Sequence, residues 1–204
     1  MCPAGKGMNF ATIDFIVLKM EIFMKKKQPK TWVTKEEYNR IINNPYLSRK
    51  DDLILQLLYS CAFRVGELVN IKVKDIDIKN STISIWESKG STDPALVPIP
   101  LSLTKMINQW IIDNRLSPNR YLFFSTHDSK VSRSLIHNLV KKAGQRAGIE
   151  KEITTHTFRR SRATHLLDAG LPIEQVSRLL RHKYLNSTMI YLRISIKGLQ
   201  KAIN

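Results

Sequence analysis

Hydrophobic and polar positions along this chain follow a helical spacing over most of its length, beginning at Thr34. Thr34 and Glu37 form a capping box, which predicts a helix from there to about Asn43. Ser48 then caps a second segment, which extends through Tyr59. The apolar residues of this second segment are dense enough to predict a helix in the core of the domain.

Between residues 75 and 100 the period of the hydrophobic pattern changes to two, which is typical of strands. Alternating isoleucines flank a turn at Lys79-Asn80-Ser81, and a third apolar run follows a loop at 88–94. The isoleucines are Ile76, Ile78, Ile83 and Ile85, and the third run contains Leu96, Val97 and Ile99. This segment therefore predicts a small three-stranded antiparallel sheet.

Before the sheet, a short helical turn is expected at 66–70. After the sheet, the chain returns to helical spacing. The four further helices are expected from Ser102 to about Asn114, from Ser132 to Gly148, from Thr154 or Thr155 to Gly170, and from Pro172 to Leu180. Serine and threonine caps, an opening proline and a closing glycine support these bounds. The predicted fold class is mainly α with one small antiparallel sheet at an edge, an α+β domain.

The charge of the chain narrows its possible partners. Its 204 residues suit one domain, alone or with a short appendage, and 33 Lys and Arg against 17 Asp and Glu give a formal charge of +16. A domain this basic repels itself unless a polyanion offsets the charge, so nucleic acid is the leading partner. Charge alone does not separate DNA from RNA or from an anionic membrane.

Residues 1–30 are expected to form an irregular leader. The apolar segment 8–24 is too short for a membrane span and is interrupted by three charged residues. The leader ends in lysines at 25–27 and 30, which form either a basic patch that follows DNA or a solvated tail.

Cys2 and Cys61 are the only cysteines in the sequence. Cys61 lies in an apolar helical stretch, which predicts a buried thiol. No Cys/His spacing indicates a zinc site, and neither a metal nor a cofactor is expected. Such cysteine usage favours an intracellular protein without disulfides.

Side chains spread along the chain supply what the cleavage of a phosphodiester needs: a nucleophile, positive charge for the phosphate oxygens and a proton for the leaving oxygen. His156 and Arg159 lie three apart, which places both on one side of a helix near its N-terminus, where anions are favoured. Arg64 offers the planar fork that pairs with phosphate, although alone it is equally a helix-end arginine that pairs with Glu67.

Four segments resemble, in the same order, the motifs of the tyrosine recombinases, the phage integrase and Xer-like family. Residues 61–68 (CAFRVGEL) are similar to the first arginine box, and residues 156–170 are similar to the second. Residues 179–182 resemble Leu-Leu-Gly-His, with Arg181 at the usual glycine, where it would crowd the turn or add a phosphate contact. Residues 187–191 resemble the segment that carries the nucleophile.

This resemblance implies a site-specific DNA recombinase or integrase that cleaves and rejoins strands without a metal, through a 3′-phosphotyrosyl intermediate. The implied roles are phosphate binding for Arg64 and Arg159, proton transfer for His156, a hydrogen bond to the phosphate for His182, protonation of the leaving 5′ oxygen for Lys89 and nucleophilic attack for Tyr191. Lys89 occupies the loop after the second strand, as the family's hairpin lysine does. Tyr184 is the nearest rival nucleophile, but it lies too close to His182 to match. The alternative is a non-catalytic DNA-binding remnant. The presence of all six residues argues against it.

The resemblance assigns residues 31–204 to a tyrosine recombinase catalytic domain, and the family's N-terminal core-binding domain is absent. An excised catalytic domain, the C-terminal part of a disrupted integrase gene and a minimal recombinase all fit this expectation. The partner implied is double-stranded DNA, with a monomer in solution and a homo-tetramer on DNA. The tail 193–204 either docks on a neighbouring protomer or is a frayed terminus. The expected location is the cytoplasm, at the nucleoid and away from membranes.

Overall fold

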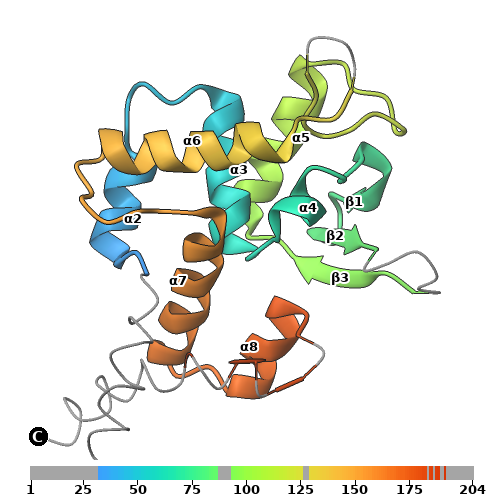
Figure 1. Cartoon of the computed structure of the whole chain (residues 1–204). Helices are drawn as coiled ribbons and strands as arrows, with labels where there is room; N and C mark the ends of the chain where they lie inside the picture. Colours follow the sequence, from blue (N-terminus) through green and yellow to red (C-terminus); the bar gives the residue numbers. More distant parts are fainter. Residues whose placement is uncertain are drawn as a thin grey trace, which may run out of the picture. The chain divides into compact units, whose positions relative to one another are not determined.

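The computed structural model describes residues 32–86, 93–125, 129–182, 184–185, 187–188 and 191 (Figure 1). Over these residues the chain is mainly helical with one small antiparallel sheet, which confirms the predicted fold class. The expected leader, the loop that carries Lys89 and the tail 193–204 lie outside them. No helix within the described residues is long and apolar enough to span a bilayer.

The helices and strands follow one another in the predicted order, and one short 3₁₀ turn was not predicted. Before the sheet the structure has the helices α2 Lys35–Ile42, α3 Arg49–Ser60 and α4 Val65–Leu68 and the 3₁₀ turn η1 Val73–Asp75. The sheet consists of β1 Ile76–Asp77, β2 Thr82–Ile85 and β3 Ala95–Pro98. After it come α5 Leu101–Asp113, α6 Arg133–Arg146, α7 Thr155–Asp168 and α8 Ile173–Leu180.

Hydroxyl side chains begin several of these helices. Thr34 and Glu37 form the expected capping box of α2, and Ser48 accepts a hydrogen bond from the backbone of Asp51 at the start of α3. Thr154, rather than Thr155, caps α7, because only its side chain meets the backbone N–H three residues on. The predicted start of α5 at Ser102 was one residue late, because Pro100 takes the cap position in its place.

The sheet has the order β1-β2-β3, and both pairs are antiparallel. Ile83 stands opposite Ile76 on one side and Val97 on the other, and both Ile83 and Val97 are buried. Leu96, on the opposite face of the sheet, is 67% exposed. The alternation therefore places one face of the sheet on the core, while its other face meets solvent.

Helix α3 forms the centre of the domain and contacts α2, α5, α6 and α7 (Figure 1). Its predicted place in the core is confirmed, since its apolar side chains are at most 1% exposed at Leu53, Ile54, Leu55, Leu57 and Leu58. Cys61, directly after this helix, is also fully buried, and burial raises the pKa of its thiol to about 12. Such a thiol is protonated and unreactive at neutral pH.

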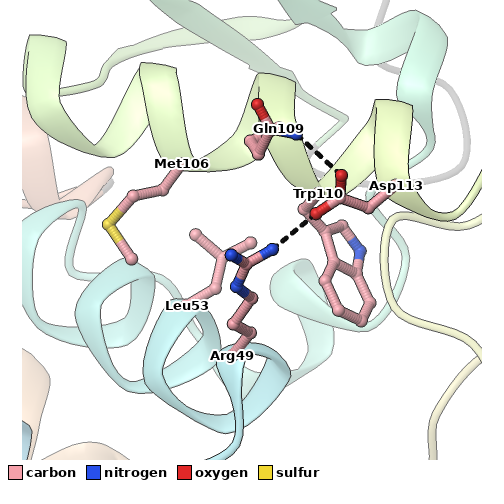
Figure 2. Close-up of a pocket in the computed structure, with 6 residues that line it drawn as sticks. All are labelled: Arg49, Leu53, Met106, Gln109, Trp110 and Asp113. Atoms are coloured by element: carbon pink, nitrogen blue, oxygen red, sulfur yellow. Dashed lines mark hydrogen bonds and ion pairs between the residues drawn. The ribbon is translucent and has the colours of Figure 1, made fainter.

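A small apolar pocket lies between parts of α3 and α5, and Leu53, Met106 and Trp110 line it (Figure 2). Arg49 and Asp113 close it by an ion pair of 2.6 Å that joins the two helices. Because the Arg49 side chain is 79% exposed, this pair contributes little to stability. No residue expected in the active site lines this pocket.

Candidate active site

Arg64 sits at the turn between α3 and α4, where it is the residue that caps α4. Its backbone N–H donates to Glu67 Oε2 at 2.7 Å, and its Nη1 donates to Glu67 Oε1 at 2.6 Å. Its Nη2 donates to the backbone carbonyl of Arg181 at 3.0 Å. The pairing with Glu67 is therefore present, and the side chain remains 41% exposed at the edge of a pocket.

Arg159 reaches the same turn from α7, but its side chain is buried. Only 4% of the residue is exposed, and its Nη1 donates to the carbonyl of Ala62 at 2.5 Å. Its Nη2 donates to the carbonyl of Leu180, at the end of α8. Burial and the nearby charge of Arg64 lower the pKa of Arg159 to about 10, so it remains a cation at neutral pH. Backbone carbonyls thus fix its guanidinium in the domain interior.

His156 lies one turn before Arg159 on α7, where its neighbours cover it only in part. It lines a pocket together with Arg64, Trp86 and Arg133. Partial burial of the imidazole lowers the pKa of His156, and the charges of Arg159 and other cations lower it further. The lowered pKa favours the uncharged imidazole, the form that is able to accept a proton.

His182 follows α8 and shares a hydrogen bond of 2.8 Å between its Nδ1 and the hydroxyl of Thr188, which is fully buried. Burial, followed by the charges of Arg159, Arg64 and Arg181, lowers the pKa of His182 to about 4. Because Nδ1 is engaged with Thr188, the other ring nitrogen is the one left for a ligand. His182 is thus a neutral imidazole beside the positive charges of three arginines.

Tyr191 lies beside His182, with ring centroids 6.4 Å apart and the rings inclined by 26°. The half-buried tyrosine packs against a small apolar cluster formed by Ala62, Ala163, Leu167, Val176 and Leu180. Its side chain is also hydrogen-bonded to that of Arg160. Burial lowers the pKa of Arg160, and the hydrogen bond with Tyr191 opposes this lowering. The phenol of Tyr191 therefore lies beside the guanidinium of Arg160 on α7.

The structure brings together Arg64, His156, Arg159, His182 and Tyr191, from four separate stretches of the chain. Lys89, the sixth predicted residue, lies outside the described residues. Tyr184 is 64% exposed. His165 packs in the fold, with its Nδ1 sharing a 2.6 Å hydrogen bond with the hydroxyl of Tyr59.

Sequence analysis missed two residues that contact this site, Thr188 and Arg160, and did not predict the partner of a third, Arg181. Thr188 orients His182, Arg160 contacts Tyr191, and Arg181 forms an ion pair of 2.6 Å with Glu67. Thr188 stands in the segment that resembles the nucleophile motif, but nothing in its spacing reveals the hydrogen bond. Arg181 was expected to crowd the turn or to contact phosphate; its side chain is instead 3% exposed and points onto Glu67.

Backbone conformation is also unusual at this site. Ala62 and Arg181, whose carbonyls accept from the two predicted phosphate-binding arginines, both adopt the left-handed region with φ of 49° and 52°. For residues other than glycine this conformation costs about 1 kcal/mol or more. Surrounding contacts must therefore stabilise both positions. Within the described ranges, no three His, Cys, Asp or Glu side chains are grouped as possible metal ligands.

Comparison with known proteins places this arrangement in context. The model of the phage integrase family matches residues 31–197. The tyrosine recombinase XerA of Thermococcus onnurineus is 36% identical over 87% of the chain and 62% of its own length. XerA of Pyrococcus furiosus is 31% identical over 98% of the chain and 75% of its own length. The chain thus spans about three fifths of the length of the first of these relatives.

Solved structures show the same fold. A crystal structure of XerA recombinase superimposes with a TM-score of 0.76 at 26% identity, covering 86% of this chain and 65% of the other. XerH recombinase, solved with a palindromic difH substrate after cleavage, gives a TM-score of 0.73 at 22% identity. That match covers 86% of this chain and 53% of XerH, and it bears on the fold alone.

Proposed function

Since the chain belongs to the phage integrase family of tyrosine recombinases, we propose that it is the catalytic domain of a site-specific DNA recombinase. The observation that carries this proposal is the convergence of two arginines, two neutral histidines and one tyrosine at the ends of α3, α7 and α8. These are the groups that metal-independent cleavage of a phosphodiester needs.

In the proposed reaction the phenolic oxygen of Tyr191 attacks the scissile phosphorus. A bond from this oxygen to phosphorus forms and the bond to the 5′ oxygen breaks, which leaves a 3′-phosphotyrosyl link. Neutral His156 accepts the phenolic proton, and Lys89 gives a proton to the departing 5′ oxygen. Reversal of the same steps, with a 5′ hydroxyl from another strand, completes strand exchange.

Arg64 and Arg159 bind the phosphate oxygens in this proposal. A guanidinium carries five N–H donors, and the backbone carbonyls and Glu67 use only some of those on each side chain. The carbonyls thus fix the arginines before substrate arrives, which lowers the cost of ordering them when charge develops on the phosphate. His182 adds a hydrogen bond from its free ring nitrogen.

We propose double-stranded DNA as the substrate, with residues 31–204 as the catalytic domain and residues 1–30 as a leader. The formal charge of +16 favours such a polyanion, and relatives of the same fold have been solved on DNA. We further propose a monomer in solution and a tetramer on DNA, linked through the tail 193–204. Sedimentation of the free protein and of its DNA complex tests this assembly.

A covalent-adduct gel on a nicked suicide substrate tests the function directly. The wild-type protein is expected to yield a DNA-linked species that survives denaturation and disappears after protease treatment. A protein that binds the same DNA without any adduct would be a non-catalytic DNA-binding remnant.

Cleavage is expected to proceed in EDTA at the rate seen with Mg²⁺. The reason is that Arg64, Arg159 and Lys89 supply the positive charge that a divalent ion gives other phosphoryl-transfer enzymes. Single-turnover adduct formation, measured with chelator and with added magnesium at constant ionic strength, checks the prediction. A strict need for a divalent ion in the cleavage step contradicts this mechanism.

DNA binding is expected to be accompanied by proton uptake at His182 below neutral pH. Its pKa of about 4 in the free protein reflects burial and three arginine charges, which the negative phosphate offsets. The pKa therefore rises on binding, and affinity increases as the pH falls from about 6.5 towards the free value. Calorimetry at pH 5.5 in buffers of different ionisation enthalpy measures the uptake. His182→Gln should reduce it, and equal uptake by that variant contradicts the assignment.

A further inference from the structure

Arg181 holds a buried guanidinium among the residues of the site, and protein groups occupy its donors. Its Nε and Nη2 donate to Glu67 at 3.4 Å and 2.6 Å, and its Nη1 donates to the carbonyl of Leu179 at 2.7 Å. Nη2 also donates to the carbonyl of Ala62 at 3.3 Å, and the guanidinium lies 5.4 Å from the ring of Phe63. With all three nitrogens engaged and 3% of the side chain exposed, Arg181 faces inward.

Glu67 is the carboxylate that two arginines share. Its side chain is 11% exposed, with Arg64 paired to Oε1 and Arg181 paired to Oε2, both at 2.6 Å. Burial alone would raise the pKa of Glu67, but the hydrogen bond and charge of Arg181, followed by the backbone and side-chain hydrogen bonds of Arg64, lower it. The three side chains together therefore carry one net positive charge. Without Arg181, Arg64 and Glu67 would form a neutral pair.

Arg181 also connects the backbone segments on which the other arginines rest. The carbonyl of Ala62 accepts from both Arg159 and Arg181, and the carbonyl of Arg181 accepts from Arg64. These contacts span 97 to 119 residues of sequence, so they fasten the turn after α3 to the end of α8. A shift at Arg181 would therefore displace both predicted phosphate-binding side chains.

We propose that Arg181 is a positioning residue, which neutralises Glu67 so that Arg64 keeps a net positive charge for the phosphate. Its forked contacts at the same time hold Arg64 and Arg159 at a fixed separation. The same contacts fix Arg181 in its left-handed backbone conformation at φ 52°, since such a conformation persists only where the surrounding structure holds it. This inference deepens the proposed function and rests on it.

Arg181→Gln tests the charge, because glutamine keeps a donor near Glu67 and loses the cation. It is expected to slow adduct formation by roughly 10- to 100-fold, as for partners that orient metal ligands. Adding Glu67→Gln removes the unbalanced carboxylate and keeps an oxygen that accepts from the backbone N–H of Arg64. The double variant is therefore expected to recover at least part of the wild-type rate of adduct formation. A purely structural role for Arg181 predicts that the double variant is no faster than the single one.

Arg115→Gln is the matched control. Arg115 also follows a helix in the left-handed conformation, with φ of 49°, but it is exposed and takes part in none of the site contacts described above. The control loses the same charge at the same kind of backbone position and is expected to cleave like wild type. Wild-type cleavage by a folded Arg181→Gln variant, or a loss as large in Arg115→Gln, would overturn the proposal.

Two measurements separate this inference from the proposed function. NMR titration of the free protein is expected to show a higher pKa for His182 in Arg181→Gln than in Arg115→Gln, because one of three depressing charges is gone. In a Tyr191→Phe background, Arg181→Gln is expected to weaken DNA binding more than Arg115→Gln does. If wild type forms no adduct, the proposed function fails, and these two comparisons still decide the role of Arg181. Equal values in both variants would reject it.

Folding is followed by circular dichroism and thermal melting. If Arg181→Gln does not fold, Arg181→Lys replaces it, because lysine keeps the charge beside Glu67 and lacks the planar fork. This variant is expected to keep the wild-type pKa of His182, because the charge is retained. It is expected to form adduct about tenfold more slowly, by the same analogy with groups that orient metal ligands. Wild-type adduct formation by folded Arg181→Lys would show that the forked contacts do not position the site.

Discussion

Tyr191→Phe is expected to abolish covalent attachment to DNA while leaving non-covalent binding nearly intact. The phenolic oxygen is the atom that would bond to phosphorus, and phenylalanine lacks only that atom. The ring keeps its apolar contacts and its place beside His182, so the fold is retained. A covalent-adduct gel and a binding titration on the same suicide substrate provide the two measurements.

Tyr184→Phe is the matched control for this experiment. Tyr184 lies seven residues earlier and is 64% exposed, whereas Tyr191 is half-buried against the apolar cluster. The control should form adduct at the wild-type rate. Adduct that persists in Tyr191→Phe and vanishes in Tyr184→Phe would transfer the nucleophile to Tyr184.

Local signals in the sequence accounted for most of the fold. The capping box at Thr34 and the cap at Ser48 depend on residues three positions apart, so the sequence alone is sufficient to predict them. The sheet was equally visible, because alternation places Ile83 and Ile85 on the buried face. The 3₁₀ turn at Val73–Asp75 was missed, since its three residues are too few to establish a period.

The candidate site was less predictable from residue chemistry alone. The resemblance to a family supplied the roles, whereas the contacts that fix the site join residues about 100 positions apart, such as Arg159 and Ala62. The inward turn of Arg181 depends on backbone conformation and on the buried Glu67, and neither is visible as a pattern. The prediction that Lys89 protonates the leaving oxygen stays a prediction, since Lys89 lies outside the described residues.

Arg159→Ala is expected to slow cleavage by at least ~10²-fold, the cost of one donor lost to a developing oxyanion. The substitution also leaves the buried carbonyl of Leu180 without the guanidinium that it binds, and leaves that of Ala62 with only its longer hydrogen bond from Arg181, of 3.3 Å. An unpaired buried carbonyl costs about 1–3 kcal/mol, so the melting temperature should fall as well. Single-turnover rates, corrected for the folded fraction at each temperature, separate the two effects.

Arg64→Ala provides the comparison within the same site. It is expected to slow cleavage by a similar factor of at least ~10²-fold. Its effect on stability should be smaller, because the Arg64 side chain is 41% exposed while Arg159 is 4% exposed. A large loss of stability with normal cleavage in Arg64→Ala would exclude it from phosphate binding.

Arg159→Lys distinguishes charge from geometry at the buried arginine. Lysine restores the positive charge, but its single ammonium cannot reach the carbonyls of Ala62 and Leu180 and a phosphate at the same time. We therefore expect Arg159→Lys to cleave nearly as slowly as Arg159→Ala, even where its DNA affinity is restored. Cleavage near the wild-type rate would show that the site uses the charge of Arg159 rather than its fork. In that case the carbonyl contacts would serve the fold, and the paired geometry proposed for the phosphate would be wrong.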